Sequence, residues 1–403
     1  MKRWLARSLL ALAACSGRRA AEPPLAEAPE ALAGARWMAT RGDGTAAAWA
    51  PSFADAITVA QPLQIRVTTA AGTTAVRGWA AATRSAIVVA TPGEDLATTV
   101  VRSWPDDRQV TVTAPASGAH VRGVWCTTGG EQCTVVWWSP AASGVTWHIA
   151  QAAWPLGSIG ATWQLDVADA GLFVPDLYQT VISDPRAPVL YVLEARGRRW
   201  SVRAIDVLQQ RDRWRTELPV GEPPLAAPPL GAASLEITGD GTAVVVVAGA
   251  ATHGAVGAAR LITLSATDGI VRREQALALG STAVASSAPV AGPRIALLGV
   301  NRYVDGGGEG AFRNLGELAA VHDVTDGAAS IRRLPPDREA PSAIVGQGNT
   351  FMVVPAGRPW HAYPATPPDW SSAGPYDLPA TGDRLPEDLT SVRAVAARSA
   401  AAP

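Results

Sequence analysis

Seven short apolar runs recur along this chain at a nearly constant spacing, and this recurrence limits its fold more than any other feature. The central residues of the runs are Ala48, Val88, Val136, Tyr191, Val246, Leu297 and Met352. Successive centres lie 40, 48, 55, 55, 51 and 55 residues apart. From residue 36 onward, no stretch sustains the spacing of 3, 4 and 7 that amphipathic helices show. The pattern therefore indicates a structure built from repeated units of short strands.

The apolar residues within a run often occupy consecutive positions, as in residues 243–247, Ala-Val-Val-Val-Val. Both faces of such a strand must be covered, which happens when a sheet is packed between two neighbouring sheets. Four-stranded sheets arranged radially meet this requirement, and periods of about 40–50 residues are typical of them. We therefore predict an all-β fold, a β-propeller of about seven (six to eight) four-stranded blades over residues 36–355.

Two of the runs are preceded by the same kind of turn. Residues 41–45 read Arg-Gly-Asp-Gly-Thr, and residues 238–242 read Thr-Gly-Asp-Gly-Thr. Asp-Gly supplies the positive φ that a two-residue hairpin demands. We predict that both turns link the first and second strands of a blade.

A second unit follows several of the runs. Residues 204–215 align without gaps with residues 263–274, and residues 66–77 and 321–332 fit the same frame. The shared pattern is an apolar residue, then Asp, Ser or Thr, usually a Gly four positions later, and an apolar, Trp or Arg residue four beyond that. It predicts a strand, a turn reversed by Gly, and a strand that returns to the rim.

This unit resembles the repeat of quinoprotein-type propellers, in which a Leu-Asp pair, a Gly turn and a Trp dock one blade on the next. Residues 286–297 also resemble that family's entry into an inner strand. The Trp is kept as Trp214, whereas the matching positions hold Val76, Arg273 and Ile331. The resemblance implies that Trp214 docks one blade on its neighbour and that the other contacts have diverged.

Enzymes of the quinoprotein family hold pyrroloquinoline quinone with a disulfide between adjacent cysteines, a Trp floor and a calcium ion. In this chain Cys126 and Cys133 lie seven positions apart, so the adjacent pair is missing. We expect no cofactor.

The N-terminal segment has the charge and hydropathy pattern of a targeting sequence. Lys2, Arg3 and Arg7 precede a short apolar stretch, residues 8–14, that ends at Cys15. A membrane-spanning helix needs about 20 apolar residues, so this stretch is too short to remain as an anchor. Leu-Ala-Ala-Cys at residues 12–15 resembles the lipobox of bacterial lipoproteins, which implies a signal peptide over residues 1–15 and a lipid on Cys15. The alternative is an ordinary secretory signal with an incidental cysteine.

The segments that flank the repeats are rich in Pro and Ala. Residues 16–35 are predicted to be a flexible tether, and residues 356–403 a tail that contributes a ring-closing strand, with 389–395 as its candidate. The layout of lipobox, tether and ring resembles the BamB-type lipoproteins of the outer-membrane barrel-assembly machinery. Because Ser16 rather than Asp follows the cysteine, the sorting rule of that class implies the outer membrane, facing the periplasm.

Cys126 and Cys133 bracket a predicted hairpin with Gly129 and Gly130 at its tip. Facing positions on antiparallel strands suit a disulfide, and an oxidising periplasm would preserve it. A redox role is the sharper alternative, but the pair lacks the Cys-x-x-Cys spacing of redox motifs.

The chain has 15 Trp against 4 Phe, and five of them crowd one region: Trp137, Trp138, Trp147, Trp154 and Trp163. Exposed, they would mark a surface that binds sugar or protein. We favour the interpretation that they are buried and fill the gaps between blades.

No catalytic or metal-binding motif is apparent. The five histidines show no metal-ligand spacing; they are His120, His148, His253, His322 and His361. Neither a Gly-x-Ser-x-Gly elbow nor a phosphate-binding loop occurs. The Gly-rich residues 301–310 carry two carboxylates, and we interpret them as a solvated loop rather than a calcium site. We assign no catalytic, cofactor-binding or metal-binding residue.

The formal net charge of −1 and the mixing of Arg with Asp and Glu give no reason to expect nucleic acid as a partner. The leading hypothesis is a lipid-anchored, non-catalytic scaffold that binds another envelope protein and contacts the membrane through its lipid. The alternative is a propeller enzyme or ligand-binding protein that acts on a small molecule or glycan at the central tunnel. Acidic or His residues converging at one tunnel mouth would favour that alternative.

Overall fold

Almost every described element of the computed structural model is a β-strand. The structure describes residues 37–40, 46–50, 63–69, 72–83, 86–104, 106–127, 132–142, 144–173, 180–184, 186–196, 199–218, 231–252, 255–256, 260–276, 283–304, 312–334, 342–347, 350–355, 361–364, 376–377 and 398–399. Within these ranges one helix occurs, the short α1 (Ala170–Phe173). No helix in the described ranges has the length and apolar character needed to cross a membrane.

The first sheet runs through seven strands in chain order. They are β1 (Trp37–Thr40), β2 (Ala46–Ala50), β3 (Leu63–Thr69), β4 (Gly72–Ala82), β5 (Ile87–Pro92), β6 (Thr98–Trp104) and β7 (Arg108–Thr113). Strand β4 belongs to two four-stranded groups, because it pairs with β3 up to Gly78 and with β5 from Trp79. A Cβ on Gly78 would lie 2.3 Å from the carbonyl oxygen of Ala90, so only Gly fits where β4 passes between the groups.

The next two sheets have four antiparallel strands each. One contains β8 (His120–Thr127), β9 (Gln132–Ala141), β10 (Gly144–Ala152) and β11 (Trp163–Val167). The other contains β12 (Val181–Ser183), β13 (Val189–Arg196), β14 (Arg199–Asp206) and β15 (Arg211–Glu217).

Three further sheets complete the described chain. The first contains β16 (Gly231–Ile237), β17 (Ala243–Thr252), β19 (Arg260–Ser265) and β20 (Val271–Ala276), and β18 (Ala255–Val256) pairs with β17. The second contains β21 (Ala283–Val290), β22 (Arg294–Val304), β23 (Phe312–Asp323) and β24 (Ala329–Leu334). The third contains β25 (Ser342–Gln347), β26 (Thr350–Pro355), β27 (His361–Pro364) and β28 (Tyr376–Asp377), and β29 (Arg398–Ser399) pairs with β25.

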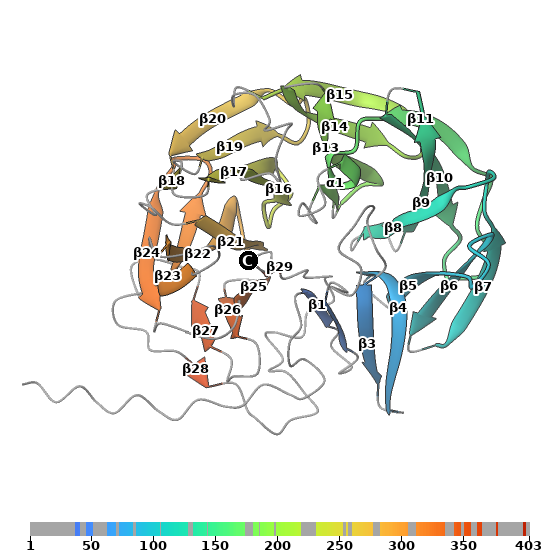
Figure 1. Cartoon of the computed structure of the whole chain (residues 1–403), viewed down its shortest axis with the longest axis horizontal. Coiled ribbons are helices and arrows are strands. Elements are labelled where there is room, and N and C mark those ends of the chain that lie inside the picture. The colour runs from blue at the N-terminus through green and yellow to red at the C-terminus, as the bar shows by residue number, and fades with distance from the viewer. Residues whose placement is uncertain are drawn as a thin grey trace, which may run out of the picture.

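The sheets follow one another around a central axis, with the first strand of each group toward the centre and the last at the rim (Figure 1). This arrangement is a β-propeller, as the sequence predicts. Each of the seven apolar runs lies in the second strand of a group, in β2, β5, β9, β13, β17, β22 and β26. The number of blades, about seven, stays a prediction.

The hydrophobic cores lie between neighbouring sheets. Val244 and Val246 of β17 face the core shared with β13 and β14, whereas Val245 and Val247 face the core shared with β22. Alternate residues of one strand thus enter two different cores. This explains why the runs are apolar at consecutive positions.

The turn at residues 238–242 joins the first and second strands of its group, as predicted, but it is longer than a two-residue hairpin. Thr238 and Ala243 close a four-residue loop, in which the Gly241 N–H donates to the Thr238 carbonyl at 2.8 Å. Only Gly241 has a positive φ, of 68°. Asp240 explains the difference, because its carboxylate accepts hydrogen bonds from Thr242 and Thr238 and stabilises the wider turn. The turn at 41–45 lies outside the described residues, although β1 and β2 flank it.

The second recurring unit forms the third strand, turn and fourth strand of a group, in β14–β15, β19–β20 and β23–β24. Gly269 and Gly327 hold the turns open with φ of 72° and 78°. In the copy without Gly, Gln210 adopts the same conformation with φ of 52°. The predicted reversal at this position is confirmed.

Trp214 of β15 docks on the next sheet. Its indole N–H donates to the Ala266 carbonyl at 3.1 Å, and a Cβ on Gly269 would lie 2.5 Å from the ring. Arg273 of β20 occupies the equivalent place one sheet later. It donates to the Thr325 carbonyl at 2.9 Å, and its guanidinium lies against Gly327. The contact between neighbouring sheets is therefore made by an aromatic ring at one seam and by a guanidinium group at the next, at the same position of the repeat.

Two predictions concern the later part of the chain, the Gly-rich loop at 301–310 and the closing strand at 389–395. The Gly-rich stretch is not a loop from its start, because residues 301–304 continue β22 and pair with β23. The paired backbone of the long β22–β23 hairpin accounts for this, and residues 305–310 lie outside the described part. The candidate closing strand at 389–395 also lies outside it, whereas β29 pairs with the inner strand β25.

We expect Trp214→Ala to destabilise the protein by about 3–5 kcal/mol, because it leaves a void against Gly269 and removes the bond to Ala266. Trp214→Phe should cost less, because it keeps most of the packing. Urea unfolding measures both. Leu208→Ala is the control, since that side chain is 56% exposed and its loss should change stability by under about 0.5 kcal/mol. Equal effects of Trp214→Ala and Leu208→Ala would contradict the docking role.

Candidate functional site

The seam between the β8–β11 sheet and the β12–β15 sheet combines buried charges and tryptophans. Three side-chain hydrogen bonds connect the inner strand of one sheet to that of the next. Arg122 donates to the Thr180 hydroxyl at 2.9 Å, the Trp125 indole donates to the Val181 carbonyl at 3.1 Å, and the Ser183 hydroxyl donates to the Cys126 carbonyl at 3.1 Å. The first strand of one sheet is therefore bonded along its length to the first strand of the next.

Asp169 forms the first of two buried charge clusters in this seam. It lies where the chain leaves β11 and begins α1, and it is fully buried. The Arg122 guanidinium donates to both carboxylate oxygens, at 2.6 and 3.2 Å, and the Gly171 N–H donates at 3.0 Å. Such a two-pronged contact fixes the geometry of both partners.

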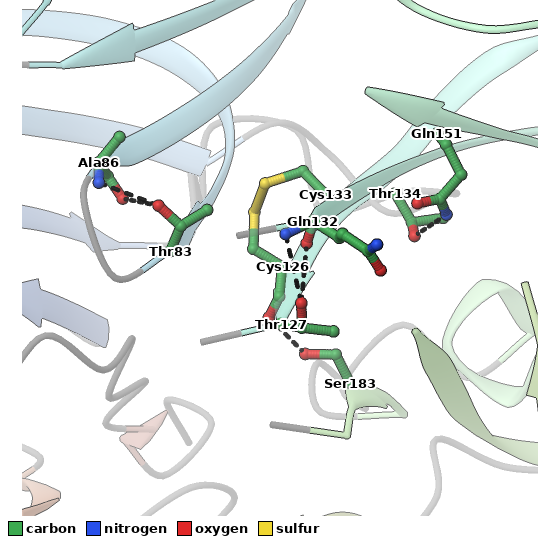
Figure 2. The surroundings of a disulfide bond; sticks show 9 residues. All are labelled: Thr83, Ala86, Cys126, Thr127, Gln132, Cys133, Thr134, Gln151 and Ser183. Atoms are coloured by element: carbon green, nitrogen blue, oxygen red, sulfur yellow. Dashed lines mark hydrogen bonds between the residues drawn. A yellow bond between two sulfur atoms is a disulfide. The ribbon is translucent and has the colours of Figure 1, made fainter. Parts of the chain in front are cut away.

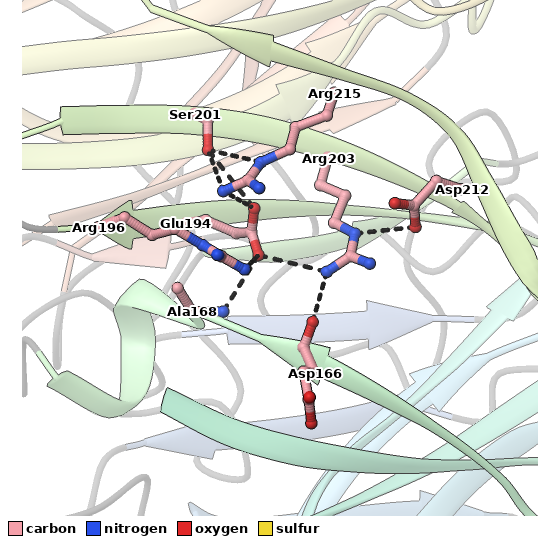
Figure 3. Close-up of polar contacts among 8 residues, drawn as sticks. All are labelled: Asp166, Ala168, Glu194, Arg196, Ser201, Arg203, Asp212 and Arg215. Atoms are coloured by element: carbon pink, nitrogen blue, oxygen red, sulfur yellow. Dashed lines mark hydrogen bonds and ion pairs between the residues drawn. The ribbon is translucent and has the colours of Figure 1, made fainter. Parts of the chain in front are cut away.

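Glu194 of β13 forms the second cluster (Figure 3). It is also fully buried. Its carboxylate lies 2.9 Å from Arg215 and 3.4 Å from Arg203, and it accepts the Ala168 N–H at 3.1 Å. Arg196 lies at 3.8 Å. The sheet itself assembles this set, because Arg203 and Arg215 face each other on adjacent strands.

Arg203 links Glu194 to the preceding sheet. It donates to the Asp166 carbonyl of β11 at 2.6 Å and to the Asp212 carboxylate at 2.8 Å (Figure 3). An isolated β-bridge between Asp169 and Glu194 brings the two clusters together where the chain passes from one sheet to the next. The carboxylates are thus held by guanidinium groups and backbone donors rather than left free.

These clusters can brace the seam but present no reactive group. Their carboxylate oxygens are already bonded to guanidinium and backbone N–H donors. Among the described residues, no three His, Cys, Asp or Glu side chains gather as metal ligands would. The sequence could not reveal either cluster, because Arg122 and Asp169 lie 47 positions apart and belong to no motif.

The predicted disulfide joins Cys126 and Cys133, with an S–S distance of 2.10 Å (Figure 2). The two residues face each other on β8 and β9, with a Cα–Cα distance of 4.1 Å, and both are buried. The hydroxyl of Thr127 accepts the Gln132 N–H at 3.3 Å just beyond the bridge. The glycines of the predicted tip lie outside the described residues, as does Cys15, the residue predicted to carry a lipid.

The interpretation that the crowded tryptophans are buried is confirmed for three of them. Trp137 and Trp147 are fully buried and Trp138 nearly so, whereas Trp154 and Trp163 are half-buried. The Trp137 indole donates to Thr99 of the preceding sheet at 2.9 Å. The three buried rings fill the space between sheets and so do not belong to an exposed binding surface.

Comparison with known proteins identifies no family for this chain. No protein-family model matches the chain, and no curated protein matches it. Among solved structures, the Dos1 propeller is 10% identical with a TM-score of 0.46, over 75% of each chain. A putative TolB from Agrobacterium tumefaciens is 10% identical with a TM-score of 0.37, over 70% of this chain and 92% of the other.

The propeller domain of the Trilobed protease from Pyrococcus furiosus is 10% identical, with a TM-score of 0.38. That match covers 62% of this chain and 70% of the other. These distant likenesses say nothing about activity or partners. The resemblance to quinoprotein-type and BamB-type propellers stays a prediction.

The histidines do not meet at one site in the described part of the chain. His148 is buried in β10, where its Nε2 lies 3.0 Å from the Ser139 hydroxyl, and burial lowers its pKa. His120 contacts the ring of Trp138 instead. His253 and the side chain of His361 lie outside the described residues.

His322 is buried at the seam between β20 and β23. Its Nδ1 lies 3.1 Å from the Gln275 amide nitrogen, and its Nε2 has no hydrogen-bond partner among the described residues. Burial lowers the pKa of His322 to about 4. The neutral ring is therefore part of the folded seam.

We expect Glu194→Gln to destabilise the fold by about 3 kcal/mol, because the buried Arg203 and the more exposed Arg215 would lose the carboxylate that they share. Asp212→Asn is the matched control. It removes a 41% exposed partner of Arg203 and should cost less than about 1 kcal/mol. Chemical unfolding at pH 7 measures both, and a larger effect at Asp212 would contradict the bracing role.

The lowered pKa of His322 predicts a loss of stability in acid. Between pH 6.5 and about 4, the unfolded chain binds a proton that the folded chain does not, so stability falls as pH falls through this window. The loss should reach at most about 3 kcal/mol and be absent above pH 7. His322→Gln should flatten the profile by this amount in unfolding experiments from pH 8 to 4. Identical pH profiles for the two proteins would exclude this contribution.

Proposed function

We propose that this chain is a lipid-anchored β-propeller of the cell envelope that acts as a non-catalytic scaffold for another envelope protein. The anchor is a lipid on Cys15, and the location is the outer membrane, facing the periplasm. The quinoprotein-type repeat and the BamB-like layout belong to the same proposal. Each of these points goes beyond the propeller fold itself.

The disulfide supports export. Structural disulfides persist in oxidising compartments such as the periplasm and are rare in the bacterial cytosol. Cys126 and Cys133 are bridged and buried, while Cys15 follows the basic residues and the short apolar stretch of the leader. One cysteine for the lipid and two for the bridge account for all three cysteines of the chain.

The observation that carries the scaffold proposal is the bracing of the seam around Asp169 and Glu194. Both carboxylates are buried and bonded to guanidinium groups from two sheets, so neighbouring blades are held in fixed register. A rigid ring presents its rim and loops in a constant arrangement, which lowers the entropic cost of binding a partner.

Two experiments test the proposal. Replacing Cys15 by Ser should abolish metabolic labelling with a radioactive fatty acid and release the protein from the membrane fraction. An unchanged distribution would exclude the anchor.

Purification from detergent-solubilised envelope should recover the protein with a stoichiometric partner. Recovery alone, together with turnover of an ester, lactone or sugar substrate by the purified protein, would overturn the scaffold role.

A further inference from the structure

The outer strands of the described sheets differ sharply in charge. Five of the seven residues of β15 and three of the six of β20 are charged. In β7, which reads Arg-Gln-Val-Thr-Val-Thr, the charge is confined to Arg108 at the start of the strand. Arg108 is itself paired with Asp106 at 3.2 Å. Charged side chains protect sheet edges from pairing with other chains, and the rest of β7 lacks them.

Strand β7 ends its sheet. Its register is entirely with β6, and it lies at the rim of the ring (Figure 1). An edge strand turns every second pair of backbone groups away from its neighbour, so these groups are open to a further strand. The outer strand β11 also has few charges, but its Asp166 carbonyl is already bonded to Arg203. Strand β7 is therefore the better candidate.

The side chains of β7 alternate in a way that specifies what could be added. Val110 and Val112 are half-buried and pack against the core shared with β9, whereas Gln109, Thr111 and Thr113 are exposed. A strand placed beside β7 would extend this core on one face and meet water on the other. It would need apolar residues at every second position and no charge opposite the valines.

The size of the edge decides between kinds of partner. Six residues offer an edge of about 20 Å, which suits one extended segment. A second ring meeting this one edge to edge would bury little beyond that strand, far less than the roughly 1,000 Å² that a stable protein–protein interface needs. The edge thus fits an extended segment better than another copy of this chain.

We propose that β7 is a docking edge that accepts an extended, uncharged segment of a partner protein by strand addition. Backbone hydrogen bonds would supply most of the affinity, and the Val110 and Val112 face would select alternating apolar residues. This inference rests on the proposed scaffold function and names the surface that the scaffold uses.

Photo-crosslinking in intact cells tests the edge. A photoreactive amino acid is placed at position 111, and matched ones at position 164 on β11 and position 208 in the β14–β15 turn. Crosslinks from position 111 to an uncharged, alternating segment of one partner would support the proposal. Crosslinks from position 208 alone would overturn it and leave the scaffold function standing. Crosslinks between two copies of the chain would overturn the proposal that the edge binds a partner's segment. The absence of crosslinks at all three positions would count against both the docking edge and the scaffold function.

A purified system gives a second readout. The probe is a short synthetic peptide of alternating valine and threonine with a lysine at each end. We expect it to slow amide hydrogen exchange in residues 109–113 at least tenfold, with no change in β15. The double variant Thr111→Lys and Thr113→Lys should weaken peptide binding at least tenfold, because both positions are exposed and the fold is kept. The control Gln164→Lys should bind normally, and protection of β15 instead of β7 would overturn the assignment.

Discussion

The structure depends on one constraint, which is that the second strand of each blade must be covered on both faces. No single sheet can provide this cover, because its own strands lie in one plane. The cover comes from the two neighbouring sheets, as the split of Val244–Val247 between two cores illustrates. Stability therefore resides in the seams between blades more than in the blades themselves, and each seam must supply a partner surface of matching shape.

The seams meet this need by different chemistry at equivalent places. At the β15–β19 seam the contact is the Trp214 ring on Gly269, backed by a hydrogen bond to Ala266. One seam further, Arg273 and Gln275 contact Gly327, Thr325 and His322 instead. At the β8–β12 seam, buried ion pairs are added, and the disulfide packs on the other side of β8, against the preceding sheet. A repeat can thus keep its backbone geometry while its contacts diverge, because the turn offers a carbonyl group to either an indole or a guanidinium donor.

The sequence predicts the repeating frame well and the polar seam poorly, for a physical reason. Strand position follows from local apolar runs and Gly turns, so the second strands and the β14–β15 and β19–β20 reversals are predicted within a few residues. The cysteine pair is close enough in sequence for its geometry to follow from a single hairpin. The partners Arg122 and Asp169, or Asp166 and Arg203, meet only after two blades have packed. The length of the Thr238–Ala243 turn was missed because the side chain of Asp240 stabilises a wider loop than the Asp-Gly pair suggests.

The strand β4 has a consequence for how such a ring can change in evolution or by engineering. Its two halves belong to different sheets, and the crossing point at Gly78 leaves no room for a side chain. Elsewhere in the described chain, successive groups are joined by connecting segments where a repeat could be inserted, deleted or given new termini. Between the first two groups, any such cut would sever a continuous strand. Recombination and circular permutation must therefore treat these two groups as one module.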